Sequence, residues 1–176
     1  MTDALKLQTG QAVALTTALA ALVPVIETER LRLRAPMLTD DPAYEAVFVS
    51  QRSVHMGGSF TAQAAFMDFC QAVAGWMLRG AGVWTITTRS GDAPLGWGLT
   101  EGAEGFGYAT EAAMAILPRA FGYFGSGGVV SYIDAANHRS ARIATRLGAR
   151  RDAVAETALN EADLHIYRHF AVGDAA

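Results

Sequence analysis

Lysine is almost absent from this 176-residue chain: 13 of its 14 basic residues are arginine, and Lys6 is the only lysine. Acidic residues number 17, the formal net charge is -3, and no basic stripe runs along the sequence. Proteins that hold nucleic acid through its phosphates need clustered Lys and Arg, so this function class is disfavoured. A kinase-like phosphate loop needs Gly-Lys-Ser/Thr, which is missing, so that class is excluded.

Cysteine is equally scarce. Cys70 is the only one, so no disulfide can form within the chain. Its neighbours Phe66, Met67, Phe69 and Val73 are apolar and predict a buried thiol that is not activated as a nucleophile. Without an internal disulfide, the chain is expected in the cytoplasm by default.

Long apolar runs are also missing. The stretch 11–25 is rich in Ala, Leu and Val, but it is too short to span a bilayer and Thr16 and Thr17 interrupt it. A secretory signal peptide is disfavoured, because the only positive charge ahead of this stretch, Lys6, is opposed by Asp3. A helical extension at the N-terminus is favoured instead, with no membrane segment.

What the chain does have is the composition of a globular protein, with 51% hydrophobic and 18% charged residues. This is enough apolar material to offset the entropy of folding in one compact domain. The sequence contains no internal repeat, low-complexity tract or clear linker. We therefore expect residues 1–25 to form an N-terminal extension and residues 26–176 to form the functional domain.

Hydrophobic spacing and turn residues predict an alternation of strands and helices. The expected strands are 29–34, 83–88, 94–99, 129–133, 150–157 and 163–170, and the expected helices are one capped by Thr39 or Asp40, one capped by Thr61, 108–124 and 137–147. The pattern predicts that segments 83–88 and 94–99 pair as a hairpin. It predicts a second, terminal hairpin from 150–157 and 163–170. The strand before 108–124 and the strand after it form a crossover. The fold class is mixed α/β, with at least one parallel crossover.

The segment Leu99–Ala112 is glycine-rich and leads directly into the helix expected at 108–124. Glycines let the backbone N–H groups converge, and the helix directs its positive dipole end to the same point, as in sites that bind a pyrophosphate. A glycine turn without any ligand remains the alternative. Dinucleotide binding is disfavoured, because Gly105-x-Gly107-x-x-Thr110 lacks the third glycine and an acidic residue at the right distance.

Four segments together resemble the GCN5-related N-acetyltransferases, and specifically their ribosomal-protein-alanine acetyltransferase-like branch. They occur in the order of the family and are 27–34, 103–112, 129–134, and 137–140 with 146–149. The resemblance extends from about Ile26 to Phe170. It implies the acyl-CoA N-acyltransferase fold, a central, mostly antiparallel sheet with a parallel crossover, flanked by helices.

The resemblance implies acetyl-CoA as co-substrate, without a metal. The pyrophosphate loop of the family, Q/R-x-x-G-x-G/A, falls on Glu104–Ala109, and the expected cofactor-binding backbone is that of Gly105, Phe106, Gly107, Tyr108, Ala109 and Thr110. Glu104 departs from the pattern, and because a carboxylate repels a pyrophosphate we expect its side chain to point into solvent. Leu99 is expected at the end of a strand that pairs with the pantetheine arm.

Asn137 and Ser140 match the N-x-x-S segment of the family, which implies that Asn137 binds the cofactor arm and that Ser140 is the acid near the thioester sulfur. Both residue types also cap helices, and the two roles are compatible. Glu101 is the candidate general base, with a solvated surface carboxylate as the alternative. The implied reaction is direct attack of a primary amine, of a protein N-terminus or a small molecule, on acetyl-CoA.

One departure from the family favours a second function class. By ordinary strand and loop lengths, about fifteen to twenty residues of the family pattern are absent between Pro94 and the glycine-rich turn. Either the hairpin is genuinely short, or the sequence lacks residues that belong to it. A deletion there removes part of the wall on the amine side, so a non-catalytic acyl-CoA-binding or regulatory protein of the same fold is the alternative. The expected partners are acetyl-CoA and an amine acceptor, with a homodimer compatible with the fold, and neither nucleic acid nor a membrane.

His165 and His169 lie four residues apart in an expected strand, where both share a face. No Cys or carboxylate set accompanies them at the spacing of metal ligands, so a zinc site is not expected.

Overall fold

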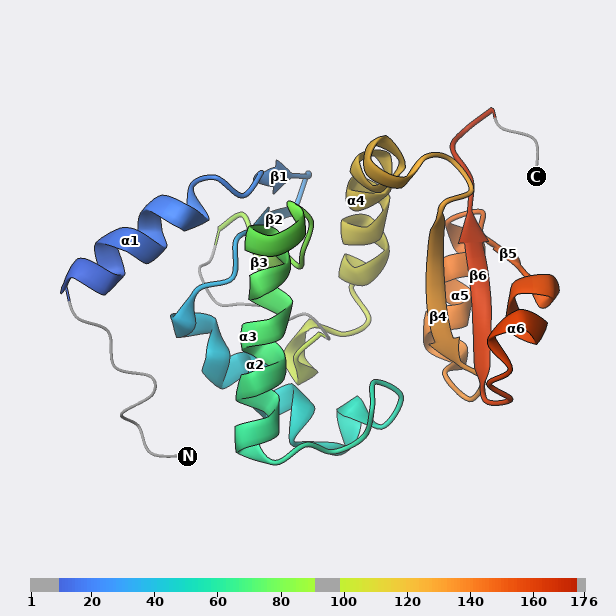
Figure 1. Cartoon of the computed structure of the whole chain (residues 1–176), viewed down its shortest axis with the longest axis horizontal. Helices are drawn as coiled ribbons and strands as arrows, with labels where there is room; N and C mark the ends of the chain where they lie inside the picture. The colour runs from blue at the N-terminus through green and yellow to red at the C-terminus, as the bar shows by residue number, and fades with distance from the viewer. Residues whose placement is uncertain (1–9, 91–98, 174–176) are drawn as a thin grey trace. The chain divides into compact units, whose positions relative to one another are not determined.

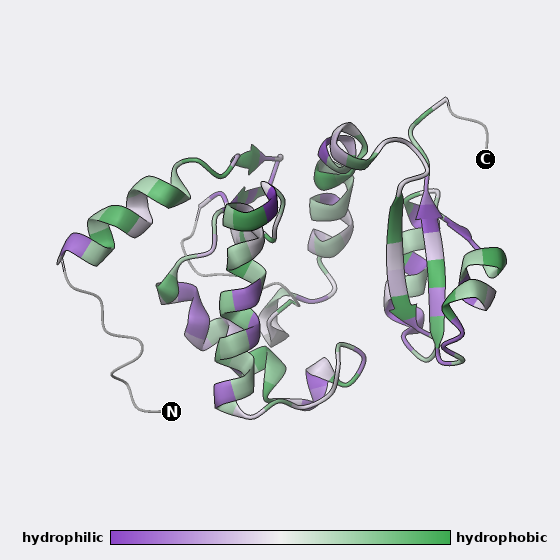
Figure 2. Cartoon of the chain, in the orientation of Figure 1, coloured by the Kyte–Doolittle hydropathy of each residue, from purple (hydrophilic) through white to green (hydrophobic). Residues whose placement is uncertain are grey.

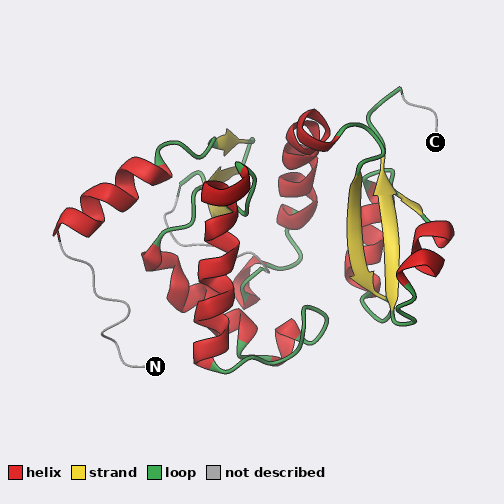
Figure 3. Cartoon of the chain, in the orientation of Figure 1, coloured by secondary structure: helices red, strands yellow, loops and turns green. Residues whose placement is uncertain are grey.

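The computed structural model describes residues 10–90 and 99–173 and divides the chain into two compact units, Met1–Phe106 and Gly107–Ala176. Figure 1 labels the helices and strands, and Figure 3 distinguishes them by colour. Both units contain helices as well as strands, so the predicted mixed α/β class is confirmed.

The first unit holds a three-stranded antiparallel sheet of order β1-β2-β3. β1 (Ile26–Glu27) pairs with β2 (Leu31–Arg34), and β2 pairs with β3 (Thr85–Thr88) from Leu31↔Thr88 to Arg34↔Thr85. Leu31 and Leu33 are completely buried on one side of β2, while Arg32 on the other side is exposed. The strand predicted from alternating leucine and charge is therefore confirmed.

The first helix of the described chain is α1 (Gly10–Ala20), at the place of the expected N-terminal helix. Figure 2 shows it as largely hydrophobic, yet it buries no residue in the part of the chain that the structure describes. No described helix is both long and apolar enough to cross a bilayer.

The core of the first unit lies between α2 (Asp41–Phe48) and α3 (Ala62–Arg79). It consists of aromatic and aliphatic side chains from both helices, namely Tyr44, Val47, Phe48, Ala65 and Phe69. The cap predicted at Thr61 is confirmed, because its hydroxyl accepts a hydrogen bond from the Ala64 N–H at 3.2 Å. Asp40 precedes α2 as predicted, but its side chain makes no capping hydrogen bond to that helix. Gly80, in the left-handed region at φ 65°, ends α3.

Cys70 corrects one expectation, because its side chain is exposed rather than buried. The buried face of α3 carries Ala65, Phe66 and Phe69, and Cys70 is turned away from it. Partial desolvation raises the pKa of the Cys70 thiol, and the negative charge of Asp41 raises it further by a smaller amount. A raised pKa disfavours the thiolate, so this cysteine is not activated as a nucleophile.

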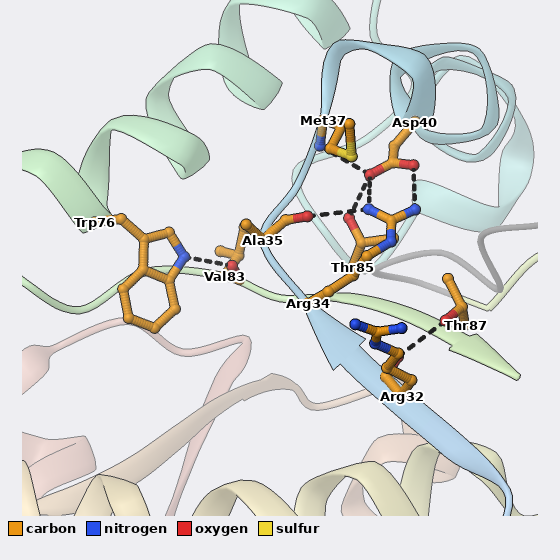
Figure 4. Close-up of polar contacts among 9 residues, drawn as sticks. All are labelled: Arg32, Arg34, Ala35, Met37, Asp40, Trp76, Val83, Thr85 and Thr87. Carbon is orange, nitrogen blue, oxygen red and sulfur yellow. Dashed lines mark hydrogen bonds and ion pairs between the residues drawn. The ribbon is translucent and has the colours of Figure 1, made fainter. Parts of the chain in front are cut away.

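A buried carboxylate joins β2, β3 and η2 (Leu38–Asp40) (Figure 4). Asp40 is almost completely buried and accepts two hydrogen bonds from the guanidinium of Arg34, at 2.7 and 2.8 Å. The Met37 N–H and the Thr85 hydroxyl donate to it at 2.9 and 2.8 Å. Burial alone would raise the pKa of Asp40, but these donors and the Arg34 charge outweigh burial and lower it. The carboxylate is therefore held in its charged form.

The second unit holds a three-stranded antiparallel sheet of order β4-β6-β5. Its elements are α4 (Tyr108–Phe124), β4 (Val129–Asp134), α5 (His138–Arg146), β5 (Arg150–Arg151), α6 (Ala153–Leu159) and β6 (Leu164–His169). β4 pairs with β6 along its whole length, from Val129↔His169 to Asp134↔Leu164. A core cluster of Ile133, Ala144 and Ala149 joins β4 to α5, and the predicted helices 108–124 and 137–147 are confirmed to within one residue.

The prediction of a strand over 150–157 is wrong beyond its first two residues, because α6 follows β5 directly. The carboxylate of Asp152 accepts a hydrogen bond from the Ala155 N–H at 2.9 Å and so caps the helix. Asn160, in the left-handed region at φ 58°, ends it. β5 still pairs with β6, so the two strands form a hairpin that is closed by a helix rather than by a turn.

The four pairings of the described strands are all antiparallel. The strand expected at 94–99, with its hairpin and the parallel crossover, falls almost entirely on residues 91–98, outside the described residues.

Candidate active site

The glycine-rich segment is a loop, as predicted, and its two key glycines adopt left-handed backbone conformations. Gly105 has φ 84° and Gly107 has φ 80°. Phe106 between them is 59% exposed, so the loop carries a large apolar side chain at the surface. Residues other than glycine rarely adopt these angles, which explains the residue type at both positions.

Gly107 is also the N-cap of α4, the first helix of the second unit. A glycine has no side chain that could occupy the N–H groups of the first turn, and no described side chain caps this helix. Tyr108, Ala109 and Thr110 form the first turn and are partly exposed. A helix of 17 residues that begins in this way is suited to bind a diphosphate through main-chain N–H groups.

Glu104 does not point into solvent, so this expectation is wrong. Its carboxylate forms an ion pair with the guanidinium of Arg52, from η3 (Gln51–Ser53) in the same unit. The side chains of Arg52 and Glu104 are only 28% and 33% exposed. The negative charge next to the loop is therefore balanced by a neighbouring positive charge.

Leu99 itself lies in a turn, and the strand expected to lead up to it falls on residues outside the described part of the structure. Its carbonyl accepts a hydrogen bond from Nη2 of Arg52 at 3.3 Å. η4 (Glu101–Ala103) follows, with Ala103 buried, and then the loop itself. Pairing of Leu99 with the pantetheine arm remains a prediction. The side chain of Glu101, the candidate base, lies outside the described part of the structure.

A second arginine of the first unit contacts the loop. Nη1 of Arg30 donates to the carbonyl oxygen of Phe106 at 3.0 Å. In a trans peptide the carbonyl and the following N–H point in opposite directions. The carbonyl of the Phe106–Gly107 peptide bond faces the Arg30 guanidinium. The N–H of Gly107, in the same peptide bond, therefore points away from that guanidinium.

Asn137 and Ser140 open α5, in the second unit. The Asn137 side chain accepts a hydrogen bond from the Ser140 N–H at 3.1 Å, which confirms its reading as a helix cap. In the preceding turn the Ala136 N–H donates to the carboxylate of Asp134 at 2.7 Å. Both candidate residues are partly exposed, so the cap does not bury them.

The order of elements in the second unit places the starts of α4 and α5 at one end of it. A short turn, 125–128, joins α4 to β4, and the two elements run in opposite directions (Figure 1). The beginning of α4 therefore lies toward the end of β4, where Asn137 follows. The expected loop backbone from Gly107 onward and the expected N-x-x-S residues are brought to the same end of this unit.

His165 and His169 both lie on β6. His169 is buried, its Nε2 lies 2.9 Å from the Ser131 hydroxyl, and burial lowers the pKa of its imidazole. Among the described residues, no group of three or more His, Cys, Asp or Glu side chains is arranged to hold a metal ion.

Comparison with known families shows the family of this chain. The chain matches the acetyltransferase (GNAT) domain over residues 30–150. It belongs to the GNAT acetyltransferase family. Family membership makes it an acyltransferase, in a family that uses acetyl-CoA, and confirms the fold expected from the sequence.

Solved structures of the family are similar to this chain. An acetyltransferase from Agrobacterium tumefaciens is 32% identical, with a TM-score of 0.77, over 85% of this chain and 95% of that one. A putative GNAT-family acetyltransferase from Bordetella pertussis is 22% identical, with a TM-score of 0.63, over 84% and 99%. RimL, a ribosomal L7/L12 alpha-N-protein acetyltransferase in complex with coenzyme A, is 14% identical, with a TM-score of 0.62, over 86% and 100%. No curated protein sequence matches the chain.

Proposed function

We propose that this GNAT protein moves the acetyl group of acetyl-CoA to a primary amine, on a protein N-terminus or a small molecule. The observation that carries the proposal is Gly107, a left-handed glycine that opens a 17-residue helix without a side-chain cap, inside the region that matches the family. In this proposal the backbone of Gly105, Phe106, Gly107, Tyr108, Ala109 and Thr110 binds the pyrophosphate, and Leu99 and Asn137 contact the pantetheine arm.

A protein N-terminus is the acceptor that we favour, in the cytoplasm. The support is the likeness of four segments of the sequence to the ribosomal-protein-alanine acetyltransferase-like branch. RimL, which shares the fold, is itself a ribosomal-protein acetyltransferase.

The proposed chemistry is a direct transfer. The neutral amine nitrogen attacks the thioester carbonyl, a C–N bond forms and the C–S bond breaks. Main-chain N–H groups stabilise the oxyanion, the Ser140 hydroxyl gives a proton to the departing thiolate, and the amine loses one proton. Glu101 is the proposed acceptor of that proton, directly or through water. The protonated Glu101 then releases a proton to solvent and Ser140 regains one from solvent, so both groups return to their starting states.

Replacement of Ser140 by Ala tests the proposed acid. The helix cap uses the main-chain N–H of Ser140, which alanine keeps, so α5 should be unaffected. We expect kcat to fall roughly 100-fold while KM for acetyl-CoA stays the same, because the hydroxyl acts only in the transition state. Steady-state kinetics with release of free thiol give both constants. An unchanged kcat would remove Ser140 from the mechanism.

Two variants of Asn137 separate its cap from its proposed cofactor contact. Asn137→Ser keeps a capping oxygen, so we expect stability to be retained and KM for acetyl-CoA to rise. Asn137→Ala should raise KM equally and also lower the free energy of unfolding by about 1 kcal/mol, because the cap is lost. If KM is unchanged in both variants, the residue is a cap alone.

A non-catalytic acyl-CoA-binding protein is the second candidate, favoured by the short segment between Pro94 and the loop. Calorimetry with CoA, together with thiol release from acetyl-CoA across a panel of N-terminal peptides and small amines, distinguishes the two. Binding with thiol release supports the transferase. Binding without thiol release on any acceptor supports the second candidate, and absence of binding contradicts both.

A further inference from the structure

We propose that Arg52 is a positioning residue for acetyl-CoA binding, which neutralises Glu104 and holds the chain segment that leads into the glycine loop. This inference rests on the proposed function, because it assumes that the loop binds the pyrophosphate.

One guanidinium contacts both ends of the segment. Nη2 of Arg52 pairs with the Glu104 carboxylate, directly before Gly105, and donates to the Leu99 carbonyl, five residues earlier. Since both contacts come from a single planar group, the turn at Leu99 and the start of the loop are tied together.

The backbone at Arg52 is held in place by several hydrogen bonds. The Arg52 N–H donates to the Ser50 hydroxyl at 3.2 Å, which caps η3. The next residue, Ser53, is completely buried, and its hydroxyl lies 2.8 Å from the Phe48 carbonyl and 2.7 Å from that of Gly58. The backbone that carries Arg52 is thus fixed to the end of α2 and to the loop before α3.

The electrostatic argument concerns the charge that a diphosphate would meet. Glu104 is adjacent in sequence to Gly105, so an unbalanced carboxylate there repels the anion that the loop is proposed to bind. Pairing with Arg52 cancels this charge at short range. The partial burial of both side chains reduces screening by salt, so the pair is worth more than an exposed one.

Four variants test the inference: Arg52→Gln, Glu104→Gln, the double variant, and Arg32→Gln as control. Arg32 is an exposed arginine of the same unit that also faces a glutamate, Glu27, at 3.9 Å. The readouts are the Kd of CoA by calorimetry and KM against kcat for acetyl-CoA, at low and at physiological salt. Circular dichroism of each variant checks the fold.

We expect Arg52→Gln to raise Kd and KM about tenfold, with kcat within about twofold, because the positive charge that faces Glu104 beside the loop is lost. Glu104→Gln alone should not raise either constant. The double variant should recover most of the loss, because no carboxylate remains, and the control should resemble the parent protein. A purely structural role for Arg52 predicts no such recovery.

The outcomes that contradict the inference are separate from failure of the proposed function. If the parent protein binds CoA and Arg52→Gln binds it equally well, or if the double variant shows no recovery, Arg52 has no such role and the proposed function stands. If Arg52→Gln does not fold, two other variants test the inference. A raised Kd of CoA in Glu104→Gln contradicts it, and so does a tenfold rise of Kd in Arg52→Lys, which keeps the positive charge. If the parent protein does not bind CoA, the proposed function itself fails.

Discussion

Replacement of Gly107 by valine is expected to abolish CoA binding. The residue has φ 80°, a conformation that costs a β-branched residue roughly 1–3 kcal/mol, so the backbone is expected to leave it. A change there turns the first N–H groups of α4 away from their common direction. The valine side chain also projects from the point where a phosphate would approach the main chain. Calorimetry with CoA measures the effect.

Gly148→Val is the matched control for this experiment. Gly148 has φ 82°, after the end of α5, and an added Cβ there meets no described atom within 4 Å. The control therefore carries a similar backbone strain away from the loop, and it is expected to lose stability but to keep CoA affinity. If Gly107→Val binds CoA as the parent protein does, the pyrophosphate loop is misplaced. If both variants lose binding equally, the effect is one of folding.

Helix boundaries in this chain were predictable because they are set by local residues. Thr61 and Asn137 accept hydrogen bonds from N–H groups three positions later, and Gly107 supplies the left-handed turn that α4 needs. Each signal lies within a few residues of the helix that it starts. The same locality made the strand at Leu31–Arg34 recognisable, since its alternation reports one buried face.

The wrong predictions depended on contacts or on angles that neighbours in sequence do not reveal. Glu104 pairs with Arg52, which lies 52 positions earlier in the sequence. Because no nearby residue indicates this partner, the Glu104 carboxylate was predicted to point into solvent. Cys70 follows Phe69 directly, and one step along a helix rotates a side chain by about 100°, away from the buried face. The segment 153–159 is rich in alanine, which favours a helix, and the cap from Asp152 decides against a strand.

The arrangement around the candidate site was predictable in part. The family resemblance located the loop and the N-x-x-S residues, and the structure confirms a loop and a helix start there. The positive charge of Arg52 beside the loop was missed, because η3 carries no motif and lies far away in the sequence. The sequence did contain one signal for it, Glu104 at a position where the family has Gln or Arg. A carboxylate beside an anion-binding loop is expected to pair with a positive charge.

Asp40→Asn is expected to cause the largest loss of stability, about 3 kcal/mol or more in the free energy of unfolding. The amide cannot accept both hydrogen bonds of Arg34, and the partly buried guanidinium loses the negative charge of the carboxylate that it contacts. Urea unfolding at neutral pH measures the loss. Glu27→Gln is the control: its contacts with Arg32 and Arg89 are 3.9 and 4.0 Å long and exposed, so a change within about 0.5 kcal/mol is expected.

The pH dependence of this difference follows from the lowered pKa of Asp40. A carboxylate whose folded pKa lies below its unfolded value, about 3.9, stabilises the fold fully above that value. The parent protein should therefore exceed Asp40→Asn by a constant margin from about pH 8 to pH 5. The margin should shrink as pH falls below about 4. In that range Asp40 takes up a proton in the unfolded chain before it does so in the folded protein, and this lowers the free energy of unfolding of the parent protein. A margin that already shrinks between neutral pH and pH 5 would show that Asp40 is not held charged by Arg34, Met37 and Thr85.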